Sequence, residues 1–177
     1  FALIIADHEA EYYFDERYVP GFWSHPKLKE LCDGVLRCWI LQNAKFDMRM
    51  LGTKDLVLAG VTMDDTIAAR LRRNDYFQSQ AYSLAEQARR HGFAKDDRVA
   101  AWIKDNKAVE ERKDFFGNTY TSPRYDRVPL ELMEEYGCMD ARVTYDLFKI
   151  YIDAFDPEDA ERQIDLYVNE DNKELAR

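Results

Sequence analysis

Hydrophobic residues gather into short runs at the start of the chain and into helical stripes toward its end. Apolar residues 1–6 and aromatic residues 12–14 flank the polar stretch DHEAE, which predicts two strands joined by a turn. The segment HPKLKELCDGVL has Leu28 and Leu31 at helical spacing and predicts a short helix. The apolar, β-prone run VLRCWIL at 35–41 predicts a buried strand.

The middle of the chain repeats the order of strand followed by helix. Residues 45–51 have helical spacing and come directly after the buried strand. The apolar run LVLAGVTM leads into DDTIAARLRR, where we expect Asp65 or Thr66 to be the helix N-cap. In SLAEQARRHG, Ser83 and Glu86 have the spacing of a capping box, which predicts another helix.

The second half of the chain is dominated by predicted helices. Residues 94–127 are polar, mixed in charge and interleaved with aromatics, and we expect one helix around Trp102 in an otherwise long excursion. An apolar stripe predicts a long helix over 129–155, and a further helix opens at the start of 156–177. Strands early and helices late predict an α/β domain in which helices cover a sheet.

Composition narrows the class of protein. The chain has 177 residues, of which 46% are hydrophobic and 14% aromatic, so it is long and apolar enough for a compact core. Its net charge of −9 argues against binding nucleic acid through a general positive field. It does not exclude an enzyme that holds one strand end through metal ions, because such a site is itself acidic.

Cysteine usage and hydropathy bear on location. Cys32, Cys38 and Cys138 form no CxxC pair, and with three histidines they suggest no zinc site. Free cysteines indicate a reducing compartment, so we expect a cytoplasmic location. There is no apolar run of membrane-spanning length and no signal peptide.

Two pairs of residues at i, i+4 spacing carry the candidate chemistry. Asn43 and Asp47 in NAKFD lie at a strand-to-helix junction, and Tyr136 and Asp140 in YGCMD share one face of the long helix. A buried carboxylate needs a partner, and a divalent metal ion is a natural one. Taken singly, a helix residue such as Asp140 is more often paired with an Arg or used as a cap than bound to a metal ion, and Asp47 is also compatible with a first-turn residue favoured by the helix dipole.

Taken together and in this order, NAKFD and YGCMD resemble motifs II and III of the DEDDy 3′–5′ exonucleases. The resemblance is to the proofreading domain of family A DNA polymerases, above all to their phage members. The stretches MDDTIAARLRR, YSLAEQARRHG and CMDARVTYDLFKIY also resemble segments of that family, so the likeness covers residues 1 to about 155.

The resemblance implies a ribonuclease H-like exonuclease fold, with a mixed sheet flanked by helices, and hydrolysis of the 3′-terminal nucleotide of DNA by two Mg²⁺ or Mn²⁺ ions. It implies that Asp140 ligates the ion on the nucleophile side and Asp47 the second ion. It also implies that Tyr136 orients the attacking water. By the same likeness, Asn43 and Phe46 line the pocket for the terminal nucleotide.

The family requires a further acidic motif, DxE, on its first strand. Asp7 and Glu9 in DHE have this spacing, which on a strand would place both carboxylates on one face. Because the flanking runs resemble the second and third strands of the family, we favour a turn at DHE and expect the DxE strand upstream of Phe1. We therefore expect an N-terminally truncated domain that, alone, binds Mg²⁺ poorly and cleaves slowly or not at all.

The likeness also predicts an organisation into two parts. Residues 1–155 form the exonuclease domain, and 156–177 form a helix leading toward a polymerase body that would supply much of the affinity for a single-stranded 3′ end of DNA. Two alternatives stay open: a catalytically inactive exonuclease-like domain that serves as a structural platform, and a DEDD-family exonuclease of RNA or DNA that is not fused to a polymerase.

Residues 94–127 allow two interpretations of their own. Aromatics interleaved with Lys and Arg are typical of surfaces that stack bases and track phosphates. The alternative, which we favour slightly, is a solvated loop whose aromatics pack on the domain.

Overall fold

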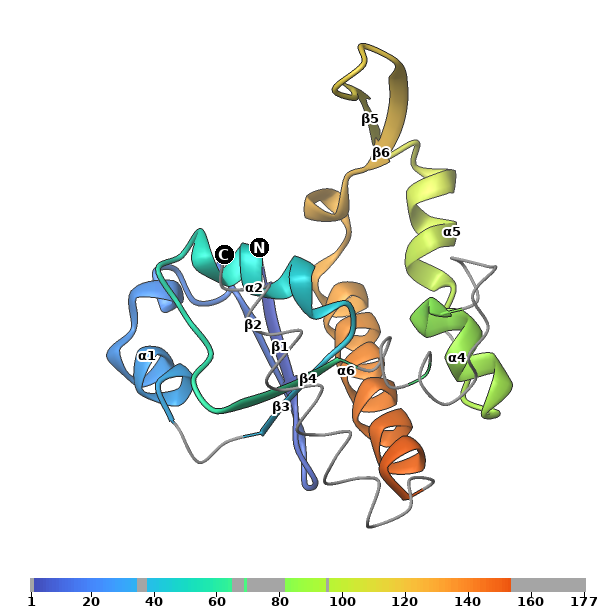
Figure 1. The fold of residues 1–177 in the computed structure, drawn as a ribbon. Coiled ribbons are helices and arrows are strands. Elements are labelled where there is room, and N and C mark those ends of the chain that lie inside the picture. Colours follow the sequence, from blue (N-terminus) through green and yellow to red (C-terminus); the bar gives the residue numbers. More distant parts are fainter. Residues whose placement is uncertain (1, 35–37, 65–68, 70–81, 95, 154–177) are drawn as a thin grey trace.

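The computed structural model describes residues 2–34, 38–64, 69, 82–94 and 96–153 (Figure 1). The N-cap predicted at Asp65 or Thr66 with the helix after it, the start of the strand predicted over 35–41, and the helix predicted over 156–177 lie outside these residues. The described elements are β1 Ala2–Ala6, β2 Glu11–Asp15, η1 Phe22–Ser24, α1 Pro26–Cys32, β3 Cys38–Leu41, α2 Ala44–Gly52, β4 Val61–Asp64, α4 Leu84–Arg90, α5 Arg98–Asp105, β5 Val109–Lys113, β6 Thr119–Pro123, η3 Tyr125–Arg127 and α6 Leu130–Asp153.

The first two strands form the predicted hairpin. β1 and β2 pair antiparallel, in a register that places Ala2 opposite Asp15. In the turn, the Asp7 carboxylate accepts hydrogen bonds of 2.8 Å from the backbone N–H groups of Glu9 and Ala10. Asp side chains favour such turns because they satisfy backbone donors locally. The prediction that DHE is a turn is therefore confirmed.

The next two strands are parallel and are connected through α2. β3 and β4 pair in a register that places Leu41 opposite Asp64, so both strands end at the same edge. With the antiparallel β1–β2 pair, they confirm an α/β domain with strand pairs of both kinds. Among the described residues, β1–β2 and β3–β4 are separate two-stranded sheets.

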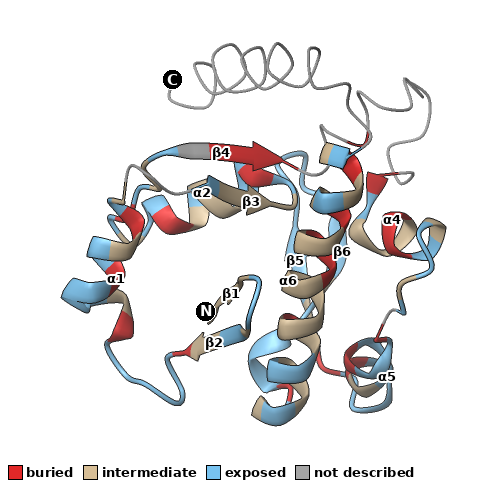
Figure 2. Ribbon diagram, turned by 90° about the horizontal axis from the view of Figure 1, so that it is seen from below, coloured by how far each residue is buried: buried red, intermediate tan, exposed pale blue. Residues whose placement is uncertain are grey.

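The long helix α6 lies between these strands and the helices α4 and α5. It contacts β1, β2 and β3 as well as α4 and α5, as Figures 1 and 2 show. Its predicted apolar stripe is confirmed, because Val143, Leu147 and Tyr151 are all buried. At Gly137 a side chain would come within 3.0 Å of Ile4 on β1, so glycine allows the helix to approach this strand closely.

Two predictions for the middle of the chain are confirmed. α4 begins after Ser83, whose hydroxyl accepts a hydrogen bond of 3.3 Å from the Glu86 backbone N–H. α5 contains Trp102, around which a helix was expected. Val99 and Ile103 on α5 are buried against residues of α6, which ties α5 to the long helix.

The rest of 94–127 differs from the expected excursion. β5 and β6 form an antiparallel hairpin, with Val109 opposite Pro123, and Figure 1 shows it extending away from the other elements. Its strands, VEERK and TYTSP, have few apolar residues and are mostly exposed. They therefore lack the alternation of apolar and polar residues that reveals a half-buried strand. Phe115 and Phe116 at its tip are exposed, so the interpretation that the aromatics pack on the domain is wrong for both.

Two further sequence expectations can be compared with the described residues. All three cysteines are free: Cys32 is buried, Cys38 exposed and Cys138 half-buried. None of the described helices combines the length and the apolar character needed to cross a membrane.

Candidate active site

The junction between β3 and α2 is built by a left-handed turn. Asn43 has φ 61° and precedes α2 as its N-cap residue without a capping bond from its own side chain. That role falls to Asp64 at the end of β4, whose carboxylate accepts a 2.8 Å hydrogen bond from the Ala44 backbone N–H. The parallel register brings Asp64 beside the helix start, since β3 and β4 end together.

Asp47 lies in the first turn of α2, where its charge is disfavoured. Burial, and then the negative charge of the nearby Asp64, raise the pKa of Asp47 to about 6. The helix N-terminus favours a carboxylate here, but it does not outweigh these two effects. Two carboxylates share this corner of the fold, so a proton or another cation would stabilise it.

Sequence reasoning missed Asp64. The available signal was that Asp64, the first Asp of MDD, ends an apolar run. The strand predicted before this run leads into NAKFD. The ends of parallel neighbouring strands meet at one edge of a sheet, so this position was accessible to prediction. The sequence pattern instead favoured Asp65 or Thr66 as a helix N-cap and gave no role to Asp64.

Tyr136 and Asp140 lie one turn apart on α6, as the spacing predicted. Burial, followed by the charge of Asp140 and a hydrogen bond to its carboxylate, raises the pKa of Tyr136 above its usual value. The phenol therefore keeps its proton and is a donor rather than a base. One turn later, the Thr144 hydroxyl donates a 2.9 Å hydrogen bond to the Asp140 carbonyl oxygen.

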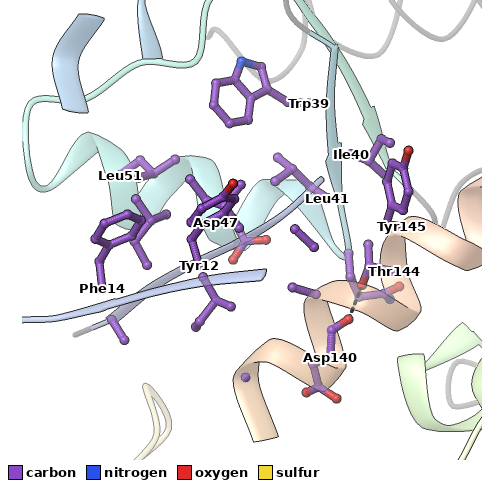
Figure 3. Close-up of a pocket in the computed structure, with 18 of the residues that line it drawn as sticks. Tyr12, Phe14, Trp39, Ile40, Leu41, Asp47, Leu51, Asp140, Thr144 and Tyr145 are labelled. Atoms are coloured by element: carbon purple, nitrogen blue, oxygen red, sulfur yellow. Dashed lines mark hydrogen bonds between the residues drawn. The ribbon is translucent and has the colours of Figure 1, made fainter. Parts of the chain in front are cut away.

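A large open cavity joins these elements. It has a volume of about 1040 Å³, and Phe46, Asp47, Tyr136 and Asp140 are among the residues that line it (Figure 3). Asn43 is exposed outside this lining. The structure thus brings four of the five predicted site residues to one cavity, whose walls come from β1, β3, α2 and α6.

The carboxylates are not gathered around one point. In Figure 3, Asp47 reaches in from α2 while the Asp140 carboxylate on α6 is turned away from it. Tyr136 and Asp140 also line a smaller hollow of about 210 Å³ between α6 and α4. Within the described ranges, no group of three or more His, Cys, Asp or Glu side chains is placed to hold a metal ion. These residues therefore do not by themselves fit a two-ion centre, which needs more oxygen ligands.

The DHE motif, Asp7 to Glu9, does not supply the further carboxylate ligands that a two-ion centre needs. Asp7 lines the cavity, but its carboxylate is engaged by the backbone of the turn. These backbone hydrogen bonds also lower the pKa of Asp7. Glu9 is exposed, so the two carboxylates do not share the face of a strand. The geometry that motif I would require is absent from this turn.

Two strands, β1 and β3, line the cavity in an unusual way. Consecutive residues of a strand point to opposite faces, so a wall formed by a face shows every second residue. Here every residue of β1 and every residue of β3 lines the cavity. Among the described residues, β1 pairs with β2 and β3 pairs with β4, and Tyr12 and Phe14 of β2 also line the cavity. Within the part of the chain that the structure describes, β1 and β3 therefore each have one edge without a strand partner, and both strands border this cavity.

Comparison with known proteins agrees with the arrangement of these elements. The 3′–5′ exonuclease family model named DNA_pol_A_exo1 matches residues 3–151, from β1 to near the end of α6. No curated protein matched the sequence. Exonucleases of this family generally use divalent metal ions. The chain therefore belongs to the 3′–5′ exonuclease family of A-type DNA polymerases and has the ribonuclease H-like α/β fold of that family.

Proposed function

We propose that this chain is a DEDDy-type proofreading domain that removes the 3′-terminal nucleotide of DNA. The observation that carries the proposal is that Asp47, Tyr136 and Asp140, from helices far apart in the sequence, line the same cavity. Phe46 lies on the same lining and is 60% exposed, as a residue that contacts a terminal base would be. Asn43 adjoins it at the start of α2.

Each side chain has a role that its surroundings support. Asp47 and Asp140 supply carboxylate oxygens, the ligands that Mg²⁺ and Mn²⁺ prefer. Bound divalent ions of this kind activate water and stabilise a leaving oxygen in phosphodiester hydrolysis. Tyr136 stays protonated, so its O–H donates a hydrogen bond and orients a water or a phosphate oxygen. Phe46 and Asn43 hold the terminal nucleotide.

The proposal requires further oxygen ligands for the ions, beyond Asp47 and Asp140. We propose that an extended acidic segment, preceding Phe1 in a longer polypeptide, lies as a strand between β1 and β3, along the edges that have no strand partner among the described residues. Neighbouring strands lie about 4.8 Å apart, so one strand would join both pairs into a single sheet. Its inward side chains would face the cavity that Asp47 and Asp140 line. We likewise propose that residues 156–177 lead toward a polymerase body.

The test is Mg²⁺-dependent shortening of a 5′-labelled single-stranded DNA by the chain and by a form extended at the N-terminus. We expect slow or no cleavage by the chain, robust cleavage by the extended form, and loss of that cleavage in Asp140→Ala. Lys149→Ala, on the same helix, is the matched control. Robust cleavage by the chain alone, abolished in Asp140→Ala, would contradict the role given to the added strand.

An inactive structural platform is the second candidate, and the incomplete ligand set of the described residues favours it. The extended form distinguishes the two. If it also fails to bind Mn²⁺ by calorimetry and to cleave DNA, the platform interpretation holds.

A further inference from the structure

The tip of the β5–β6 hairpin presents two adjacent aromatic rings to solvent. Phe115 is 97% exposed and Phe116 is 86% exposed. Their rings contact each other edge to face, with centroids 5.7 Å apart and planes at 86°. Burying a phenylalanine side chain is favourable, so a pair left in water at the end of an arm is typical of a surface that binds a ligand.

The tip is ordered by its own hydrogen bonds. The Asp114 carboxylate accepts from the Phe116 backbone N–H at 2.9 Å, and from the backbone and side-chain nitrogens of Asn118 at 2.8 and 2.9 Å. Gly117 has φ 85°, a conformation that closes the turn and that other residues rarely adopt. The backbone that carries the two rings is therefore ordered before any ligand arrives, which lowers the entropic cost of binding.

The base of the hairpin is tied to the candidate active site. The Ala108 N–H donates to the Ile103 carbonyl at 2.9 Å, and the Arg124 N–H donates to the Ala108 carbonyl at 2.8 Å. Ala108 and Ile103 belong to a buried cluster against which Tyr136 packs. The seven steps along the chain from Ala108 to Phe115 span about 23 Å at about 3.3 Å each. That reach equals about seven nucleotides of a stacked strand.

The charge of the arm differs from that of the chain. Residues 107–124 carry four Lys or Arg against three Asp or Glu, whereas the whole chain has a net charge of −9. Within the described hairpin, Arg112 and Arg124 pair with Glu110, while Lys107 and Lys113 are exposed and make no ion pair. Aromatic rings beside cations are the composition of surfaces that stack bases and contact phosphates.

We propose that Phe115 and Phe116 stack on unpaired bases of the DNA strand whose 3′ end enters the candidate active site. The proposal deepens the proposed function, on which it rests, by assigning a second contact to the same substrate. Single-stranded DNA is favoured over duplex because paired bases hide the faces that aromatic rings need.

The test is fluorescence anisotropy of a labelled single-stranded oligonucleotide with the full chain, at low salt and in EDTA. We expect Phe115→Ala/Phe116→Ala to raise the Kd at least fivefold, the smallest loss expected when a stacked base is released. Phe115→Trp/Phe116→Trp should retain binding, and Tyr18→Ala, an exposed aromatic outside the hairpin, should leave it unchanged. Circular dichroism checks that each variant is folded.

The outcomes separate this inference from the proposed function. Binding by the double alanine variant equal to that of the unmodified chain overturns it, as does a chain that shows no binding to single strands. Equal DNA binding together with self-association that the double alanine variant loses would assign the tip to a protein contact instead. Because EDTA removes metal, failure of the hydrolytic role appears separately, in the Asp140→Ala cleavage assay.

Discussion

Replacing Asp47 by Asn should stabilise the metal-free protein at neutral pH. The pKa of Asp47 rises from 3.8 to about 6, because the carboxylate is buried beside Asp64. At about 1.4 kcal/mol per pK unit, this difference corresponds to at most about 3 kcal/mol. Asp47 is half-buried, so solvent screening reduces the expected gain to about 1–2 kcal/mol.

The sign follows from proton linkage. The folded state binds a proton on Asp47 more tightly than the unfolded state, so its stabilising effect is present below pH 3.8 and is lost as pH rises through about 6. Asn has nearly the shape of a protonated Asp and cannot ionise. The Asp47→Asn variant and the unmodified chain should therefore have similar stability at pH 4 and differ by about 1–2 kcal/mol at pH 8.

Urea unfolding followed by far-UV circular dichroism in EDTA, from pH 4 to pH 8, measures this difference. Asp105→Asn at the end of α5 is the matched control, and we expect no such pH-dependent gain. An Asp47→Asn variant that is less stable at pH 8, or a gain that does not change with pH, would refute the electrostatic reasoning. Adding Mn²⁺ to the form extended at its N-terminus should then stabilise the unmodified protein more than its Asp47→Asn variant.

Three further predictions use other parts of the structure. Asp64→Ala should destabilise the chain by about 1 kcal/mol in urea unfolding, because the Ala44 N–H loses its acceptor, whereas Asp64→Asn should retain most of the stability. The Arg17 ion pair lowers the pKa of Asp15 to about 2, so its contribution is present above pH 3.8 and is lost as pH falls through about 2; Asp15→Asn should lose about 1–2 kcal/mol at pH 7 and nothing near pH 2, and a constant deficit would contradict this. In the extended form, Tyr136→Phe should lower the cleavage rate while Mn²⁺ binding by calorimetry stays unchanged, since the phenol positions water or phosphate rather than metal.

Much of the fold could be predicted because its elements carry strong local signals. The Asp7 turn, the Ser83 cap and the apolar stripe that includes Leu147 are set by neighbouring residues, and all are confirmed. The β5–β6 hairpin was missed because most residues of its polar strands are exposed, so burial left no pattern in the sequence. The sequence analysis favoured packing of Phe115 and Phe116 on the domain because apolar residues are normally buried, but both are exposed.

The candidate site shows a similar division. The i, i+4 spacing correctly placed Tyr136 and Asp140 on one face of a helix, because that relation is local. The contact of Asp64 with the start of α2 depends on the parallel register of β3 and β4, which residue spacing does not reveal. The roles of all five predicted site residues stay predictions: Asn43, Phe46, Asp47, Tyr136 and Asp140.

The cavity combines a carboxylate whose charge is disfavoured with two strands that could each pair with a further strand. This combination favours the proposed active exonuclease, completed by an added strand, over the inactive structural platform. A site that had lost its function would be free to replace Asp47 with a neutral residue and relieve the repulsion from Asp64. In this chain, Asp47, whose charge is disfavoured, lines the same cavity as β1 and β3. A strand inserted there would pair with both strands, and acidic side chains on it would hold cations that relieve the same repulsion. Stability and catalysis would then depend on one segment, so hydrogen exchange at the amides of β1 and β3 should slow in the extended form as cleavage appears.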